Sequence, residues 1–350
     1  MSRSVVDSRL IRDHFDLVVL PIQFTANLHE VGRNHWAKMI RLLGFTLRLL
    51  YLGLIHRPEL VYFTLVPIGM PFYRDFMLLS LIKAMGLRAV LHLHGIGVKE
   101  SARRRINRVL HRRTFSGVEI IHLSPLLHED IAAYIPRERC HFLANGIPSP
   151  PAMGDTLPPP LEKRENSVRF LFLSNITEEK GPLDFVRALG ILRDRGRSFH
   201  ATIAGAVISH DCLNRLERLI GELHLENRVV YVGPKYDQEK AALFFRSDIF
   251  VLPTHRESFP LVLLEAMSHG LPTIAPVEGA IPAIIEDGVT GILYQKKDVE
   301  NLAQAMESLE MNHDLRHSMG KAGKKRFQEH FTLEVFEARL ERILSTCLQR

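Results

Sequence analysis

Two glutamates, Glu257 and Glu265, stand eight residues apart in a stretch of this 350-residue chain whose residue types suit ligand chemistry. A strand-like run, residues 248–253, precedes the pair, and a helix-like run, residues 260–269, carries the second glutamate. We therefore expect Glu257 in a loop at the carboxyl end of a strand, where open α/β sheets bind ligands. An ionised carboxylate only accepts hydrogen bonds, so the pair suits a ligand rich in hydroxyl groups, such as a sugar and a ribose.

The alternative is that both glutamates are ordinary surface residues. Glu257 would then complement the dipole of a first helical turn, and Glu265 would be solvated. The context favours a ligand site, because residues 261–267 are apolar apart from Glu265. A charge in such a helix is rarely buried without a partner.

A loop that suits a phosphate lies between a predicted strand, residues 168–173, and a predicted helix, residues 183–193. It contains Asn175 and the pair Lys180-Gly181. Free backbone amides at a helix start, together with the charge of Lys180, suit a phosphate or diphosphate. A surface loop lysine without a ligand is the alternative for this fragment alone.

Two further turns follow predicted strands. Gly205 ends the strand at residues 201–204 with small residues that permit close approach of a backbone. Pro234 and Lys235 follow the strand at residues 229–232, in a turn whose backbone could cradle a base. All these segments lie at carboxyl ends of parallel strands, so one elongated ligand could touch them all.

The order of elements predicts an α/β fold with two domains, because short apolar runs alternate with longer helical stretches. The predicted strands are residues 17–20, 60–63, 89–93 and 119–123, then 168–173, 201–204, 229–232, 249–252, 273–275 and 291–294. A proline-rich stretch separates the two halves. The predicted domains are residues 1–150 and 166–331, with a linker at residues 151–165 and a last helix at residues 332–350.

The amino terminus departs from the usual doubly wound pattern, which opens with a strand and a glycine-rich turn. Residues 2–12 are helix-like, and the first apolar strand candidate, residues 16–20, resembles a second strand. We therefore expect the first strand and its glycine loop to be missing from this sequence, or to be encoded upstream of Met1.

The cysteines and the apolar stretches argue against several classes of protein. Three scattered cysteines without metal-ligand spacing support neither a disulfide framework nor a zinc site. The amino terminus is polar and shows no secretory signal. The longest apolar stretch, residues 39–55, carries Arg41 and Arg48 and is too short and charged for a confident membrane span. We expect a cytoplasmic protein.

The charge is uneven along the chain. Residues 1–150 hold 20 Lys and Arg against 11 Asp and Glu, a net +9; since the whole chain is +6, residues 151–350 carry −3. Basic residues interleaved with leucines in residues 41–57 and 103–113 suit an anionic membrane surface, at the inner face of the membrane, and a solvated helix face is an equal alternative. No nucleic-acid-binding motif accompanies the charge, so nucleic acid is not the expected partner.

The residues of the second half resemble the large retaining glycosyltransferase family 4, whose GT-B fold consists of two Rossmann-like domains facing a cleft. The resemblance covers most of the chain, from His14 onward, and the block at residues 257–272 is quite specific. The matching pieces are Lys180-Gly181, residues 247–253, Glu257 with Glu265, residues 265–267 with 270–272, residues 286–288 with 290–293, and, in the first half, residues 92–95 and 145–147.

The resemblance implies roles for these residues. Glu257 would contact hydroxyls of the transferred sugar, Glu265 would hold the nucleotide ribose, and Lys180 would neutralise the leaving diphosphate. His94 would lie across the cleft near the sugar. The implied donor-binding set is Asn175, Gly205, Pro234, Lys235, Arg256, Ser258, Phe259, Pro260, Leu261 and Glu265.

The implied reaction moves a sugar from a nucleotide-diphosphate sugar to a glycan or lipid-linked acceptor in cell-surface polysaccharide biosynthesis. It would retain the anomeric configuration without a metal or a cofactor, since the nucleotide-sugar is a substrate. The sequence contains no Asp-x-Asp motif, which agrees with that expectation.

Two departures from the family pattern leave alternatives open. Asn175 stands where the family usually has an arginine, so Lys180 or Arg256 would carry more of the diphosphate charge. A missing first-domain loop would leave a weak or inactive enzyme. The alternatives are therefore a GT-B protein that binds a nucleotide-sugar without transferring it, and a nucleotide-sugar epimerase. An NAD-dependent oxidoreductase is disfavoured because no Gly-x-Gly-x-x-Gly follows a strand.

Overall fold

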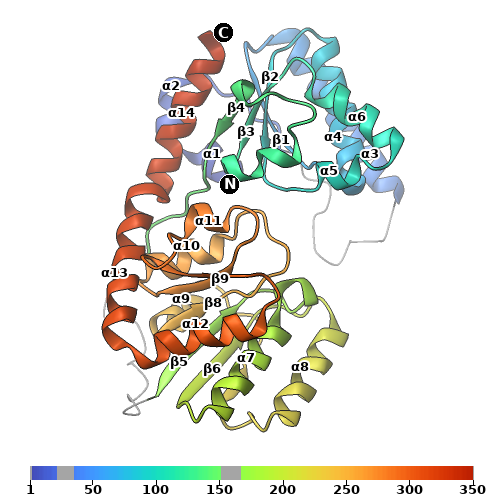
Figure 1. Cartoon of the computed structure of the whole chain (residues 1–350). Coiled ribbons are helices and arrows are strands. Elements are labelled where there is room, and N and C mark those ends of the chain that lie inside the picture. The colour runs from blue at the N-terminus through green and yellow to red at the C-terminus, as the bar shows by residue number, and fades with distance from the viewer. Residues whose placement is uncertain (1, 22–34, 151–166, 350) are drawn as a thin grey trace. The chain divides into compact units, whose positions relative to one another are not determined.

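The computed structural model describes residues 2–21, 35–150 and 167–349 and divides into two α/β units (Figure 1). Unit 1 comprises Met1–Leu143 and Glu337–Arg350, and unit 2 comprises Ala144–Phe336. Each unit contains one sheet whose strand pairs are all parallel, so the predicted fold class is confirmed. The predicted linker, residues 151–165, lies outside the described residues, and the domain boundaries stay predictions.

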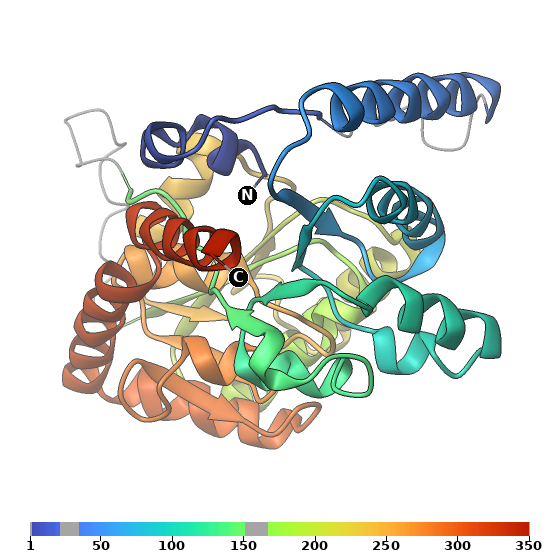
Figure 2. The same ribbon diagram turned by 90° about the horizontal axis from the view of Figure 1, so that it is seen from above.

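Unit 1 is built on a four-stranded sheet in the order β1-β2-β3-β4. Its strands are β1 (Val61–Leu65), β2 (Ala89–Leu93), β3 (Glu119–His122) and β4 (Cys140–Phe142). Its α-helices are α1 (Ser2–Asp7), α2 (Arg9–His14), α3 (His35–Ile55), α4 (Gly69–Ala84), α5 (Val98–Ser101), α6 (Arg105–Phe115) and most of α14 (Leu333–Gln349). Helices α3, α4 and α6 lie side by side on one side of the sheet (Figures 1 and 2).

Unit 2 is built on a six-stranded sheet in the order β10-β9-β8-β5-β6-β7. Its strands are β5 (Val168–Leu173), β6 (Phe199–Ala204), β7 (Val229–Tyr231), β8 (Ile249–Val251), β9 (Thr273–Pro276) and β10 (Gly291–Tyr294). Its α-helices are α7 (Pro182–Asp194), α8 (His210–Glu222), α9 (Asp237–Phe245), α10 (Leu261–Ser268), α11 (Ile281–Ile284), α12 (Val299–Met311) and α13 (His313–His330). The order reverses between β5 and β8, so these two central neighbours flank a topological switch point.

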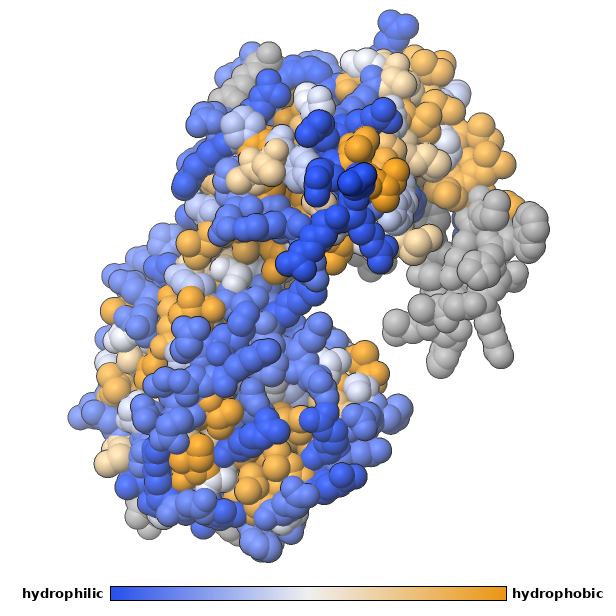
Figure 3. All heavy atoms as spheres, turned by 45° about the vertical axis from the view of Figure 1, so that its right-hand side comes forward, coloured by the Kyte–Doolittle hydropathy of each residue, from blue (hydrophilic) through white to orange (hydrophobic). Residues whose placement is uncertain are grey.

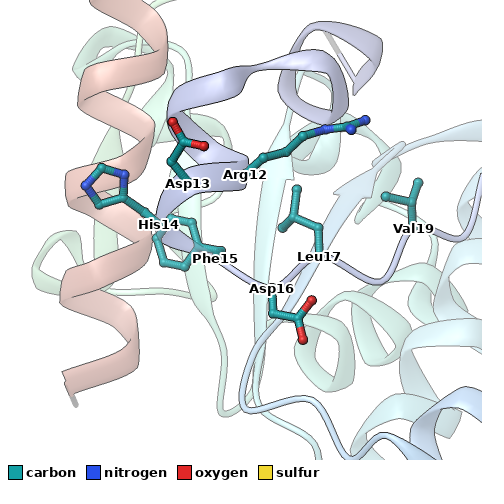
Figure 4. A pocket seen from close by; sticks show the side chains of 7 residues that line it. All are labelled: Arg12, Asp13, His14, Phe15, Asp16, Leu17 and Val19. Atoms are coloured by element: carbon teal, nitrogen blue, oxygen red, sulfur yellow. The ribbon is translucent and has the colours of Figure 1, made fainter.

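The predicted strands are confirmed in both units except for residues 17–20, and β4 was missed. Residues 16–21 follow α2 as irregular chain, with Leu17, Val18 and Val19 at least one third exposed. A strand needs a neighbour that takes its backbone hydrogen bonds, and none of the described strands pairs with this segment. Residues 12–17 and Val19 instead line a cavity of about 480 Å³ (Figure 4). β4 was missed because three residues give too short a pattern.

Helix α3 contains the long apolar stretch that the sequence singled out. Its side chains Leu42, Phe45 and Leu49 pack against the core of unit 1. Among the helices that the structure describes, none is long and apolar enough to cross a membrane.

The core of unit 1 contains buried histidines. His111 on α6 and His122 on β3 have no solvent exposure, and burial lowers the pKa of each to about 4. An unfolded histidine titrates near pH 6.5. Between about pH 6.5 and pH 4 the unfolded chain therefore binds protons that the native chain does not, so stability falls as the pH falls through this window.

Replacing His122 should flatten this pH dependence. The Nδ1 atom of His122 accepts a hydrogen bond from the backbone N–H of Leu123 at 2.9 Å, and the amide oxygen of His122→Asn can take that place. We expect the free energy of unfolding to fall less between pH 7 and pH 5 in the variant than in the parent, by up to about 2 kcal/mol for one fully buried histidine. Urea denaturation at both pH values measures the difference. The exposed His210→Asn is the control, and equal pH slopes for parent and His122→Asn would contradict this assignment.

Candidate functional site

Two loops meet at the switch point of unit 2. The first joins β5 to α7 and includes a short 3₁₀ turn, Glu178–Lys180; the second joins β8 to α10. At a switch point the chain leaves the two neighbouring strands in opposite directions, which opens a crevice at their carboxyl ends. We therefore expect a ligand to bind at these two loops.

Lys180 and Glu257 face each other from these two loops. Lys180 Nζ lies 2.6 Å from Glu257 Oε2, and the side chains are 25% and 16% exposed. The other oxygen of Glu257, Oε1, accepts a hydrogen bond from the backbone N–H of Ser258 at 3.1 Å. The structure thus joins two residues that the sequence analysis placed in separate motifs.

Two glycines let the loops approach this closely. A Cβ on Gly181 would lie 1.9 Å from the backbone oxygen of Pro253, and its φ of +71° is one that residues with a side chain rarely adopt. A Cβ on Gly279, in the loop after β9, would lie 2.1 Å from the backbone oxygen of Glu257. Close to the Lys180–Glu257 contact, the backbone at Gly181 therefore packs against that of Pro253, and the backbone at Gly279 packs against that of Glu257.

A second polar link joins the same loops. His255 Nε2 lies 2.7 Å from Asp184 Oδ2, and the backbone N–H of His255 donates to the oxygen of Glu179 at 2.7 Å. The hydroxyl of Thr254 also donates to that oxygen at 3.1 Å. Sequence reasoning missed this link, because no spacing relates residues 71 positions apart.

The start of α10 lies directly after Glu257. Pro260 precedes the helix and provides no side-chain cap. No capping side chain therefore occupies the backbone amides of the first turn. Phe259 is buried, with its ring centroid 6.3 Å from that of Phe331, and the backbone oxygen of Ser258 accepts from the N–H of Ala280 at 2.9 Å. These two contacts fix the turn, and the positive dipole end of α10 lies at the carboxyl edge of the sheet.

Glu265 lies one turn into α10 and contacts a residue that the sequence analysis did not select. Lys240 Nζ, on α9, lies 2.6 Å from Glu265 Oε2 and 2.7 Å from Oε1. Both side chains are about a quarter exposed, at 28% and 27%. No sequence signal separates Lys240 from the other surface lysines, so only the packing of α9 beside α10 identifies it.

The remaining predicted donor-binding residues of unit 2 lie in loops that follow strands of the sheet or at the start of α10. Asn175 follows β5 and is exposed, as is Arg256 in the loop after β8. Gly205 follows β6, and its backbone oxygen accepts a hydrogen bond from the hydroxyl of Tyr231 at 2.8 Å. Pro234 and Lys235 follow β7, where Lys235 pairs with Glu239 at 2.8 Å. Leu261 opens α10.

His94 belongs to unit 1 and directly follows β2. Its ring centroid lies 4.1 Å from that of His92, and burial lowers the pKa of His94 to about 4. The ring is therefore neutral at pH 7 and can both donate and accept a hydrogen bond. Its role in catalysis stays a prediction.

No cluster of three or more histidine, cysteine, aspartate or glutamate side chains able to hold a metal ion occurs among the residues for which the structure gives a position.

Residues 155–326 match the family model described as glycosyl transferases group 1. The chain is similar to the D-inositol 3-phosphate glycosyltransferase of Corynebacterium aurimucosum, with 32% identity over 183 residues, 51% of this chain and 42% of that protein. It is also similar to the capsular polysaccharide biosynthesis glycosyltransferase CapM of Staphylococcus aureus, with 26% identity over 179 residues, 51% of this chain and 46% of that protein. The matches span less than half the length of these curated relatives.

Solved structures resemble the chain over a larger part of its length. Anabaena HepE in complex with UDP and glucose has a TM-score of 0.71 at 19% identity, covering 87% of this chain and 82% of that chain. A glycosyltransferase from Rickettsia africae has a TM-score of 0.72 at 19% identity, covering 94% of this chain and 85% of that chain. These likenesses show the fold, two Rossmann-like α/β domains of the GT-B type, as the sequence predicted.

The close approach at Gly181 can be tested against a matched glycine. Gly181→Ala adds a Cβ that meets the backbone of Pro253, whereas Gly196→Ala, at the nearly identical φ of +73°, meets nothing within 4 Å. We expect Gly196→Ala to cost about 1 kcal/mol of stability from backbone strain. Gly181→Ala should cost clearly more, because the β5–α7 loop must also move away from β8. Urea denaturation compares the two variants, and equal losses would show that the loops are not tightly packed here.

Proposed function

We propose that this chain, whose residues 155–326 belong to the glycosyl transferases group 1 family, moves a sugar from a nucleotide-diphosphate donor to a glycan or lipid-linked acceptor. The product would be a polysaccharide or another glycoconjugate. The names of the similar proteins support the reaction class, and the UDP and glucose bound by Anabaena HepE support the donor class. The enzyme would work in the cytoplasm, where a lipid-linked acceptor would bring it to the inner face of the membrane.

The observation that carries the proposal is the contact between Lys180 and Glu257 at the switch point. In the free protein the ammonium and the carboxylate neutralise each other. A bound diphosphate would offer Lys180 a stronger anionic partner, and Glu257 would then be released to accept hydrogen bonds from sugar hydroxyls. One contact thus supplies both halves of a donor site.

The same groups account for the leaving diphosphate. Negative charge grows on the diphosphate as the bond to the sugar breaks, and a fixed cation with helix amides stabilises it. Lys180 and the first turn of α10 provide these groups. We propose that they act without a metal ion and that the anomeric configuration is retained, as the resemblance to family 4 implies.

Glu265 is proposed to bind the ribose of the donor. Its carboxylate contacts Lys240, which holds it in one orientation in the free protein. With Asn175 neutral at the position of the usual arginine, Lys180 and Arg256 remain as the expected cations for the diphosphate. His94, neutral at pH 7, is proposed to hydrogen-bond the transferred sugar.

The two partners of the central contact should respond in opposite ways to substitution. Lys180→Met should weaken UDP binding about 10- to 100-fold, because a hydrogen bond to a charged group contributes about 1.5–3 kcal/mol. Glu257→Gln should leave UDP binding unchanged or tighter, since the carboxylate no longer competes for Lys180, and should abolish transfer. Isothermal titration calorimetry with UDP measures binding, and release of UDP from UDP-sugars in the presence of acceptor measures transfer.

Lys321→Met, an exposed lysine on α13, is the control for charge removal. Equal UDP affinity in Lys180→Met and the parent would contradict the diphosphate role. UDP binding without release from any donor would favour the alternative of an inactive nucleotide-sugar-binding protein. Conversion of one UDP-sugar into another without an acceptor would favour an epimerase.

A further inference from the structure

Helices α3, α4 and α6 of unit 1 form a surface almost without carboxylates. Their sequences contain one acidic residue, Asp75 on α4. Asp75 is fully buried and lies 2.6 Å from Arg74, so it contributes no charge to the surface. We refer to the outward side of α3, α4 and α6 as the basic-apolar face.

Helix α3 is apolar on both sides. Leu42, Phe45 and Leu49 face the core of unit 1, as described above. Its outward side carries six large hydrophobic side chains that are 58–68% exposed: Ile40, Leu43, Leu47, Tyr51, Leu54 and Ile55. Their spacing of three or four residues places most of them in one stripe. A surface helix of a soluble protein normally shows polar residues on this side, so the stripe indicates a further apolar partner.

The neighbouring helices extend the apolar surface. Met70, Tyr73 and Met77 of α4 are 79%, 38% and 38% exposed, and Ile106 and Val109 of α6 are 60% and 49% exposed. Since α4 contacts both α3 and α6, these side chains belong to one face. The space-filling view shows hydrophobic side chains gathered on this part of unit 1 (Figure 3).

Basic side chains are interleaved with the apolar ones. Arg41 and Arg48 are exposed on α3, and Ile106 and Val109 alternate with exposed arginines of α6. These α6 arginines are Arg105, Arg108, Arg112 and Arg113. A partner of this face must therefore offer both negative charge and an apolar layer.

We propose that the basic-apolar face docks on an anionic lipid bilayer, with α3 lying in the plane of the interface. Lipid headgroups supply the negative charge, and the acyl layer beneath them takes the apolar stripe. A nucleic acid has the charge without the apolar layer, and a second copy of this chain would bring two positive faces together. The inference rests on the proposed function only in that a lipid-linked acceptor would be met there; docking itself requires no donor.

Vesicle co-sedimentation with the whole chain tests the docking. We expect binding to vesicles of phosphatidylcholine mixed with phosphatidylglycerol and weak or no binding to phosphatidylcholine alone, with binding reduced by salt. Failure of the parent chain to bind the mixed vesicles would overturn the proposal.

Paired variants separate the apolar and the basic contributions. Leu43→Ser with Leu47→Ser should weaken binding about tenfold or more, because two buried leucines are lost from the interface. The matched control is Val289→Ser with Met311→Ser, which removes exposed apolar side chains of unit 2. Unchanged binding in the α3 variant, or an equal loss in its control, would contradict the inference.

A second pair tests the arginines. The α6 variant is Arg105→Gln, Arg108→Gln and Arg112→Gln, and its control is Lys321→Gln, Lys324→Gln and Lys325→Gln on α13, which removes the same charge from unit 2. Each arginine near an anionic surface contributes about fivefold, so the α6 variant should bind about tenfold or more weakly than its control. Equal binding would contradict the proposal. All of these positions are exposed. Melting curves of the variants would check that they fold.

Two further measurements distinguish lipid docking from self-association and from the proposed reaction. If light scattering finds a dimer of the parent chain and a monomer of the variant Leu43→Ser with Leu47→Ser, lipid docking is overturned in favour of self-association. Lys180→Met should bind vesicles like the parent. If the chain transfers sugar but does not bind vesicles, only the docking is overturned. If it binds vesicles but never releases UDP from a donor, only the proposed reaction is overturned.

Discussion

The contact between the β5–α7 loop and the β8–α10 loop is the constraint on which the candidate site depends. Neighbouring strands at a switch point send their chains apart, so little holds such loops together unless specific contacts do. Here Gly181 packs against the backbone of Pro253, and two polar links, Lys180–Glu257 and His255–Asp184, cross the same boundary. The two loops are held at a fixed spacing because backbone packing and polar links act at one place.

Charge is balanced differently in the two units. In unit 2 the two site glutamates each contact a lysine, Glu257 with Lys180 and Glu265 with Lys240, so these four charges cancel. A ligand that carries its own negative charge and hydroxyl groups can exchange with these partners without leaving a charge buried alone. In unit 1 the arginines of α6 have no acidic residue on their own helix, so that face stays positive and suits an external anionic partner.

The strands and the candidate loops could largely be predicted from sequence, because their signals are local. A buried parallel strand is a short apolar run, and a polar loop after it must lie at the carboxyl edge of the sheet. Glu257, Glu265 and Lys180 were found in this way. The same local reasoning failed for residues 17–20, whose apolar run has no neighbouring strand, and for β4, whose three residues give too little pattern.

The sequence by itself determined the fold class, the family resemblance of the second half and the candidate residues for a nucleotide-sugar site. Only the tertiary structure decided which of them contact one another. Lys180 and Glu257 are 77 residues apart, and Lys240 and Glu265 are 25 residues apart on different helices. Strand order brings such pairs together, and strand order follows from the packing of the whole sheet rather than from any local spacing.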